Sequence, residues 1–277
     1  MIRLLPLLVM LSLVGSAGAG ETNLVAQGWA AYRLGEFDRA TRFFESAGPT
    51  DAAAVYGLAT TWAWRRPKED RGRAEQLYHE VIRLAPASEW AAWSWLGLAR
   101  LQHVVPVGQE PNYPKVRAAY QAVIDRFPRH PASTEAFLQQ QATLVAALNP
   151  NEARTALAAM EKFLAEQPQS PYVSAVYSLQ AECFQTLGEP AAQLAASLRA
   201  WETTEVDPEN PRSDAAGTYW KLATLAEFEA GDFATARKFY GKLIAEYPKD
   251  QRKFPAKQAL ARMAELESRL RAEGAPR

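Results

Sequence analysis

The feature that most limits how this chain can fold is a proline that returns about every forty residues. These prolines are Pro86, Pro128, Pro168, Pro208 and Pro248, with separations of 42, 40, 40 and 40 residues. Before four of them stand similar segments with apolar residues three or four positions apart, at 78–86, 120–128, 160–168 and 240–248. That spacing marks one face of a helix, and proline ends a helix because it has no amide proton to donate. The sequence therefore predicts a helix that recurs and stops at a proline.

Further apolar-periodic segments of three to four turns alternate with these helices. They lie at 23–34, 52–64, 89–101, 134–148, 172–187 and 215–230, and a final charged one lies at 257–271. The composition agrees, because the chain has 52 Ala and only 4 Ile, and Ala loses no side-chain entropy in a helix. We therefore predict an all-α chain, an α-solenoid of six helical hairpins closed by a C-terminal capping helix.

One residue template recurs at the two ends of the chain. It reads Gly28, Tyr32, Gly35, Phe37, Ala40, Phe44 and Ala47 in the first hairpin, and Trp220, Phe228, Gly231, Phe233, Ala236, Tyr240 and Pro248 in the last. A small residue lets a neighbouring helix approach, and an aromatic residue one turn later fills the space beside it. Counting from the same template, Gly57 and Gly97 take the small position in hairpins two and three.

These residues resemble the tetratricopeptide repeat, and the resemblance extends over essentially the whole chain after residue 19. A forty-residue period also suits a HEAT-like array, but the Gly-x-Phe-x-x-Ala-x-x-x-aromatic phrase favours the tetratricopeptide repeat. Segments 123–131 and 243–248 are similar to repeats of the outer-membrane assembly lipoprotein BamD and of the periplasmic coordinator of the Tol-Pal system. This narrower resemblance implies an extracytoplasmic, envelope-associated repeat protein.

The first 19 residues are predicted to be a secretory signal peptide, with one solenoid domain following at 20–277. Arg3 precedes an apolar run from Leu4 to Val14, and Ala17 and Ala19 stand at the −3 and −1 positions of a cleavage site. The apolar run is shorter than the roughly 20 residues that span a bilayer. We therefore expect an exported mature chain, periplasmic or secreted, without stable membrane insertion.

The charge pattern argues against nucleic acid as a partner. The 31 basic and 31 acidic residues are interleaved along the chain, whereas nucleic-acid-binding domains usually carry a basic face. The one locally basic stretch, 65–73, is interrupted by Glu69 and Asp70 and is interpreted as a solvated loop.

No arrangement of residues in the sequence predicts catalysis, a metal site or a cofactor. His79, His103 and His130 have no second ligand at metal-binding spacing. Cys183 lies in an apolar helical segment, where a free cysteine behaves as a small hydrophobic residue. We therefore expect a protein that is not an enzyme.

The tetratricopeptide resemblance implies that the first helix of each hairpin lines a concave groove. Counting along the template places the following residues there: Trp29, Tyr32, Arg33, Trp62, Ser94, Gln140, Glu182, Lys221 and Phe228, together with Leu58, Leu98, Ser178 and Leu225. Such a mixed surface, aromatic at its N-terminal end, suits an extended peptide or a partner helix. The expected function is a scaffold or adaptor that binds a protein partner in the cell envelope.

Two alternatives remain open at this point. The first is a glycan-binding module of polysaccharide export or cell-wall assembly, in which exposed tryptophans stack on sugar rings. The tryptophans include pairs two residues apart, whose side chains point about 200° apart on a helix, so both members of a pair cannot face the same side. A glycan-binding module would therefore show Trp29, Trp62 and Trp95 exposed together near Gln102, whereas Trp90 and Trp93 buried would indicate core packing. The second open point is the proline-rich loop from Gln102 to Pro114, which could equally be functional or merely tolerated at the surface.

Overall fold

The computed structural model describes residues 23–204, 214–272 and 274, which form helices and turns with no strand among them. The helices are α1 (Leu24–Arg33), α2 (Phe37–Ala47), α3 (Ala52–Trp64), α4 (Arg71–Leu84), α5 (Glu89–His103), α6 (Tyr113–Arg126), α7 (Pro131–Val145), α8 (Pro150–Glu166), α9 (Val173–Leu187), α10 (Pro190–Glu202), α11 (Ala215–Thr224), the π-helical turn η1 (Leu225–Ala230), α12 (Phe233–Glu246) and α13 (Lys253–Ala272). The all-α fold of successive helical hairpins is confirmed. The predicted signal peptide and Pro208 lie outside the described residues.

Four of the five repeating prolines stand just beyond the end of a helix. Ala85, Phe127, Gln167 and Tyr247 each follow the last residue of a helix and precede one of the repeating prolines. All four adopt nearly the same backbone conformation, with φ between −143° and −123° and ψ between 54° and 66°. A residue before proline is pushed out of the helical region in this way. Gly35 and Gly231 occupy the tight turns of the first and last hairpins with φ of 77° and 68°, which glycine adopts readily.

Two helices start earlier than the periodicity indicated. α7 begins at Pro131 rather than at 134, because a proline is tolerated in the first turn of a helix, where its missing amide proton has no partner anyway. α13 begins at Lys253 rather than at 257. The 102–114 loop is shorter than predicted, since α5 continues to His103 and α6 begins at Tyr113.

Close packing of small against aromatic residues holds the hairpins together, as the template predicts. The Phe44 ring lies so near α1 and α3 that a Cβ atom at Gly28 or Gly57 would stand 2.5 or 2.4 Å from it. A Cβ atom at Gly97 would likewise stand 2.5 Å from the buried Tyr78 ring. The aromatic rings thus occupy the space that the glycines leave open.

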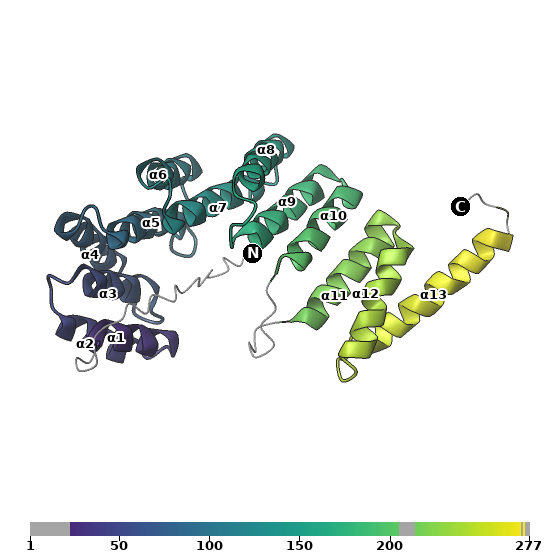
Figure 1. Cartoon of the computed structure of the whole chain (residues 1–277), viewed down its shortest axis with the longest axis horizontal. Coiled ribbons are helices and arrows are strands. Elements are labelled where there is room, and N and C mark those ends of the chain that lie inside the picture. Colours follow the sequence, from purple (N-terminus) through teal and green to yellow (C-terminus); the bar gives the residue numbers. More distant parts are fainter. Residues whose placement is uncertain (1–22, 205–213, 273, 275–277) are drawn as a thin grey trace. The chain divides into compact units, whose positions relative to one another are not determined.

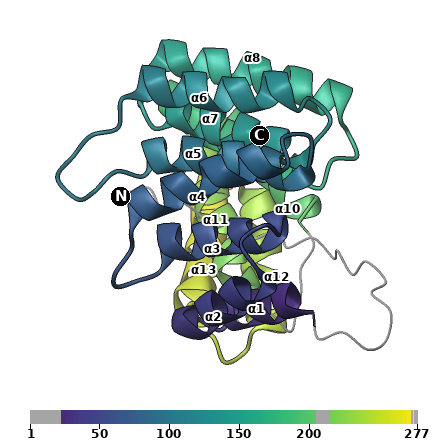
Figure 2. The same cartoon turned by 90° about the vertical axis from the view of Figure 1, so that its left-hand side faces the viewer.

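The described helices group into two compact units, with the division between Thr143 and Leu144 in the last turn of α7. In the first unit, consecutive helices from α1 to α6 pack against each other, and α3 also contacts the two first helices α1 and α5 (Figure 2). Its largest fully buried side chains include Tyr78, Leu96 and Tyr120.

The second unit contains α8 to α13. α11 passes directly into η1, and α12 packs against both of them and against α13 (Figure 1). Tyr240, Leu243 and Met263 are fully buried at its centre. Within the described parts of the chain, no helix is both long and apolar enough to cross a membrane.

Candidate functional site

The predicted groove residues lie on α1, α3, α5, α7, α9, α11 and η1, the first helices of the hairpins. We call the surface of these helices, together with the side chain of Arg262 from α13, the first-helix face and describe it within each unit separately. The structure places some of these residues on the surface and others in the core. Whether any of them contacts a partner stays a prediction.

Trp29 and Tyr32 on α1 are half-buried and form an aromatic cluster. The Trp29 ring lies edge-on to Tyr32 and Phe44, with ring centroids 5.5 and 5.3 Å apart, and 5.9 Å from Tyr56. Burial raises the pKa of Tyr32 to about 12. Arg33, at the end of α1, is exposed. At this end of the face, the charged side chain is more accessible than the aromatic ones.

Trp62 on α3 lies in contact with two guanidinium groups. The Cζ atoms of Arg65 and Arg73 lie 4.8 and 4.5 Å from its ring centroid, and Arg65 also donates a 2.6 Å hydrogen bond to Asp38 of α2. Arg65 is buried, so the basic stretch 65–73 is not only the solvated loop that the sequence suggested. Its arginines help to join the first two hairpins.

Several predicted groove residues are covered by neighbouring helices. Ser94 on α5 has no exposed surface, and Leu58 and Leu98 are each only 9% exposed. Ser94 is therefore not part of the exposed surface of α5, and its role in binding a partner stays a prediction. Gln140 on α7 is half-buried, and its Nε2 donates to the Arg117 carbonyl oxygen and to Gln121 Oε1, both at 3.1 Å.

A buried ion pair on the first-helix face was not predicted from the sequence. Arg100 on α5 donates to the carboxylate of Glu135 on α7, whose side chain is 4% exposed. Beside it, His103 Nδ1 lies 3.0 Å from the Tyr120 hydroxyl, and burial lowers the pKa of His103. The pairing of Arg100 with Glu135 could not be predicted, because the sequence does not show which helices become neighbours.

In the second unit, the predicted residues Ser178, Glu182, Lys221 and Phe228 are exposed, and Leu225 is half-buried. Phe228 is 66% exposed although it lies within a packed hairpin. The Cζ atom of Arg262 on α13 stands 5.2 Å from its ring centroid.

Glu227, the residue before Phe228, holds the Arg262 side chain in position. Its buried carboxylate accepts hydrogen bonds from Arg262 Nε at 3.0 Å and Nη2 at 2.5 Å, and from the Tyr240 hydroxyl at 2.9 Å. Glu227 and Phe228 both lie in η1, and π-helical turns occur frequently at functional sites. The exposed Phe228 ring therefore lies beside the Arg262 guanidinium, which the buried carboxylate of Glu227 holds in position.

The tryptophans do not form the exposed cluster that a glycan-binding module requires. All eight lie within the described residues, and each is buried or half-buried. Trp93 is 9% exposed and packs in the same core as Leu96, with Trp90 against it. These positions are those expected from core packing.

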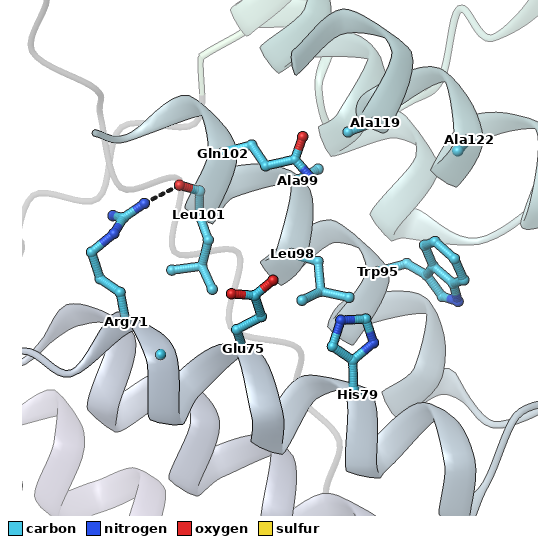
Figure 3. Close-up of a pocket in the computed structure, with 11 residues that line it drawn as sticks. Arg71, Glu75, His79, Trp95, Leu98, Ala99, Leu101, Gln102, Ala119 and Ala122 are labelled. Atoms are coloured by element: carbon cyan, nitrogen blue, oxygen red, sulfur yellow. Dashed lines mark hydrogen bonds between the residues drawn. The ribbon is translucent and has the colours of Figure 1, made fainter. Parts of the chain in front are cut away.

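One pocket of the first unit is lined by residues of α4, α5 and α6 (Figure 3). Its volume is about 260 Å³. Arg71, Glu75 and His79 enter from α4, Trp95, Leu98, Leu101 and Gln102 from α5, and Ala119 and Ala122 from α6. No three His, Cys, Asp or Glu side chains of the described residues come together in a way that could hold a metal ion.

Comparisons with known proteins agree with the repeat and the fold. Residues 218–250, from α11 to just beyond α12, match the family described as tetratricopeptide repeat. PilW, described as a widely conserved type IV pilus biogenesis factor, is 16% identical with a TM-score of 0.56, over 82% of this chain and 94% of its own. PilF of Pseudomonas aeruginosa is 14% identical with a TM-score of 0.55, over 84% and 96%. No curated protein sequence matches the chain.

At these identities the structural likeness concerns the fold alone, and the sequence match covers one hairpin. The repeat predicted from the sequence is thereby confirmed in the last hairpin, and the hairpin architecture is confirmed over the described chain. The protein has the fold of a tetratricopeptide-like α-solenoid, with a tetratricopeptide repeat at residues 218–250.

Proposed function

We propose that this protein is an exported scaffold or adaptor that binds a protein partner in the cell envelope through its first-helix face. The architecture supports binding, because stacked helical hairpins present extended surfaces without needing a catalytic centre. The signal peptide predicted at residues 1–19 supports export. The similarity of segments 123–131 and 243–248 to repeats of BamD and of the Tol-Pal coordinator supports a location in the cell envelope.

The observation that carries the proposal is the exposed Phe228 beside the fixed Arg262. Aromatic and arginine side chains are enriched among the residues that dominate binding energy in protein interfaces. Arg262 has already lost much of its conformational freedom, because Glu227 holds two of its N–H groups. Binding of a partner to Arg262 therefore costs little further side-chain entropy. Lys221, exposed on α11, adds a second cation to the first-helix face of the same unit.

The similarity in fold to PilW suggests the kind of process. PilW is described as a type IV pilus biogenesis factor. We include in the proposal that this chain assists the assembly of a multi-protein machine in the envelope, as a binding component of that machine.

The test compares two phenylalanines with equal exposure. Phe228 is 66% exposed in η1, and Phe254 is 67% exposed in the first turn of α13. Chemical cross-linking in intact cells, followed by mass spectrometry of the recovered protein, is carried out for Phe228→Ala, Phe254→Ala and the unchanged chain. Truncating a residue central to an interface costs about 1–2 kcal/mol or more, which corresponds to roughly a tenfold loss of affinity.

We expect the cross-linked partner to be recovered from the unchanged chain and from Phe254→Ala, and to fall strongly for Phe228→Ala. Recovery that is equal for both variants would contradict the placement of the binding surface. Abundant protein that yields no partner but retains a glycan would contradict the scaffold function itself.

A further inference from the structure

The pocket between α4, α5 and α6 has a wall that already attracts guanidinium groups. Arg71 donates hydrogen bonds to the carbonyl oxygens of Leu101 and Val104, at the C-terminal end of α5. Helix C-termini carry a partial negative charge from the aligned peptide dipoles. Trp95 also lines the pocket, and the Cζ atom of Arg126 on α6 lies 4.4 Å from its ring centroid. Both arginines are therefore engaged by the protein itself.

Two acceptors of the same pocket receive no hydrogen bond from a described protein residue. Gln102 Oε1 is buried and has no hydrogen-bond partner. The Glu75 carboxylate is exposed, and among the described residues no Lys, Arg or His forms an ion pair with it. An exposed carboxylate is satisfied by water, but a buried acceptor without a donor is unfavourable and rare in folded proteins. Figure 3 shows the carboxylate of Glu75 directed toward α5, between the side chains of Leu101 and Leu98.

We propose that this pocket binds the guanidinium or ammonium group of a basic side chain from a protein partner. Glu75 supplies the opposite charge, Gln102 Oε1 a hydrogen-bond acceptor, and the Trp95 ring a surface for the apolar stem. A volume of about 260 Å³ is below the usual 300–1,000 Å³ of small-molecule sites, which suits one side chain. This inference rests on the proposed function, since it takes the ligand to be part of a protein.

The positive groups in the pocket and next to it do not fill this position. Arg71 is directed to the α5 carbonyl oxygens, and Arg126 is exposed on α6, where water screens its charge. His79 lines the pocket from α4, one turn after Glu75. The pocket lies between the second helices α4 and α6, and Leu98 on α5 is the one residue of the predicted groove that lines it.

The experiment uses two capped amino acids that differ in charge and hardly in shape. Nα-acetyl-arginine amide carries a guanidinium, and Nα-acetyl-citrulline amide carries a neutral urea group of the same size. Each is titrated into the isotopically labelled mature chain, and the indole N–H signal of Trp95 and the side-chain amide signals of Gln102 are followed by NMR. Trp95→Phe and Gln102→Leu identify these signals.

We expect saturable shifts with the arginine probe, with a dissociation constant in the millimolar range, and at least threefold weaker binding of the citrulline probe. Glu75→Gln should weaken arginine binding about threefold, because exposed ion pairs contribute modestly. Glu161→Gln, which removes an exposed carboxylate from α8, should change nothing. Equal shifts by both probes, no shift at either side chain, or an unchanged affinity in Glu75→Gln would overturn the proposal.

Gln102→Leu separates binding from folding. Replacing a buried amide that has no partner at its oxygen by an apolar side chain of similar size should leave the melting temperature unchanged or higher. The same substitution should weaken binding of the arginine probe. If it lowers the melting temperature and leaves probe binding intact, Gln102 is only structural and the proposal fails. Because the probes are small molecules, this result does not depend on whether a protein partner is found at the first-helix face.

Discussion

Replacing Gly97 by alanine tests how the hairpins pack. A Cβ atom at this position would lie 2.5 Å from the Tyr78 ring, closer than real Cβ contacts allow. Tyr78 cannot easily move, because it is 1% exposed and its hydroxyl lies 3.3 Å from Thr60 Oγ1. Overpacking a core costs about 1–3 kcal/mol, whereas alanine in place of glycine favours a helix by about 1 kcal/mol. The packing cost is larger, so we expect a net loss of about 1 kcal/mol.

Gly241 provides the matched control. It lies within α12, and a Cβ atom there would meet no other atom within 4 Å. Gly241→Ala should therefore stabilise the protein by up to about 1 kcal/mol, since only the helix preference changes. The two variants are compared with the unchanged mature chain by urea unfolding followed by circular dichroism. The reasoning is refuted if Gly97→Ala is as stable as the unchanged chain while Gly241→Ala is not stabilised.

Three further predictions concern charge, thiol reactivity and export. The hydrogen bonds from the Arg252 guanidinium lower the pKa of Asp250 to about 2 in the folded chain. The ionised Asp250 therefore stabilises the fold fully above its ordinary pKa near 4, and this stabilisation is lost as the pH falls from about 4 to 2. Acid unfolding followed by circular dichroism should therefore show a smaller loss of stability over that range for Asp250→Asn, and an identical loss would contradict the pairing. Cys183 is fully buried and burial raises its pKa to about 11, so a thiol reagent at pH 8 should label it within minutes only after denaturation; rapid labelling of the native chain would contradict this. Mass spectrometry of the protein from its source cells should find Gly20 as the first residue, and a retained Met1 would contradict the predicted cleavage.

The parts of the fold that depend on local sequence were predictable. Backbone conformation before Pro128 and Pro248 follows from the proline itself, and the close approach at Gly57 follows from the small side chain in the template. These features act within one hairpin or between consecutive helices. Their physical cause is therefore visible in the spacing of residues along the chain.

The candidate site depends on contacts that spacing does not show. Counting along a regular helix placed Ser94 on an accessible face, but neighbouring helices cover it completely. The π-helical turn of η1 departs from the regular period, and it contains both the buried Glu227 and the exposed Phe228. Gln102 lies at the end of α5, and only the arrangement of α4, α5 and α6 brings it into the same pocket as Glu75.

The most direct test of the account is photo-cross-linking at matched positions on first and second helices. A photoreactive amino acid replaces Arg33 on α1 or Lys221 on α11, and in separate chains Arg42 on α2 or Lys238 on α12, all four of which are exposed. The chains are irradiated in intact source cells and the attached proteins are identified. We predict that one envelope protein is captured at positions 33 and 221 and not at positions 42 and 238. Capture of the same protein mainly at positions 42 and 238 would contradict binding through the first-helix face.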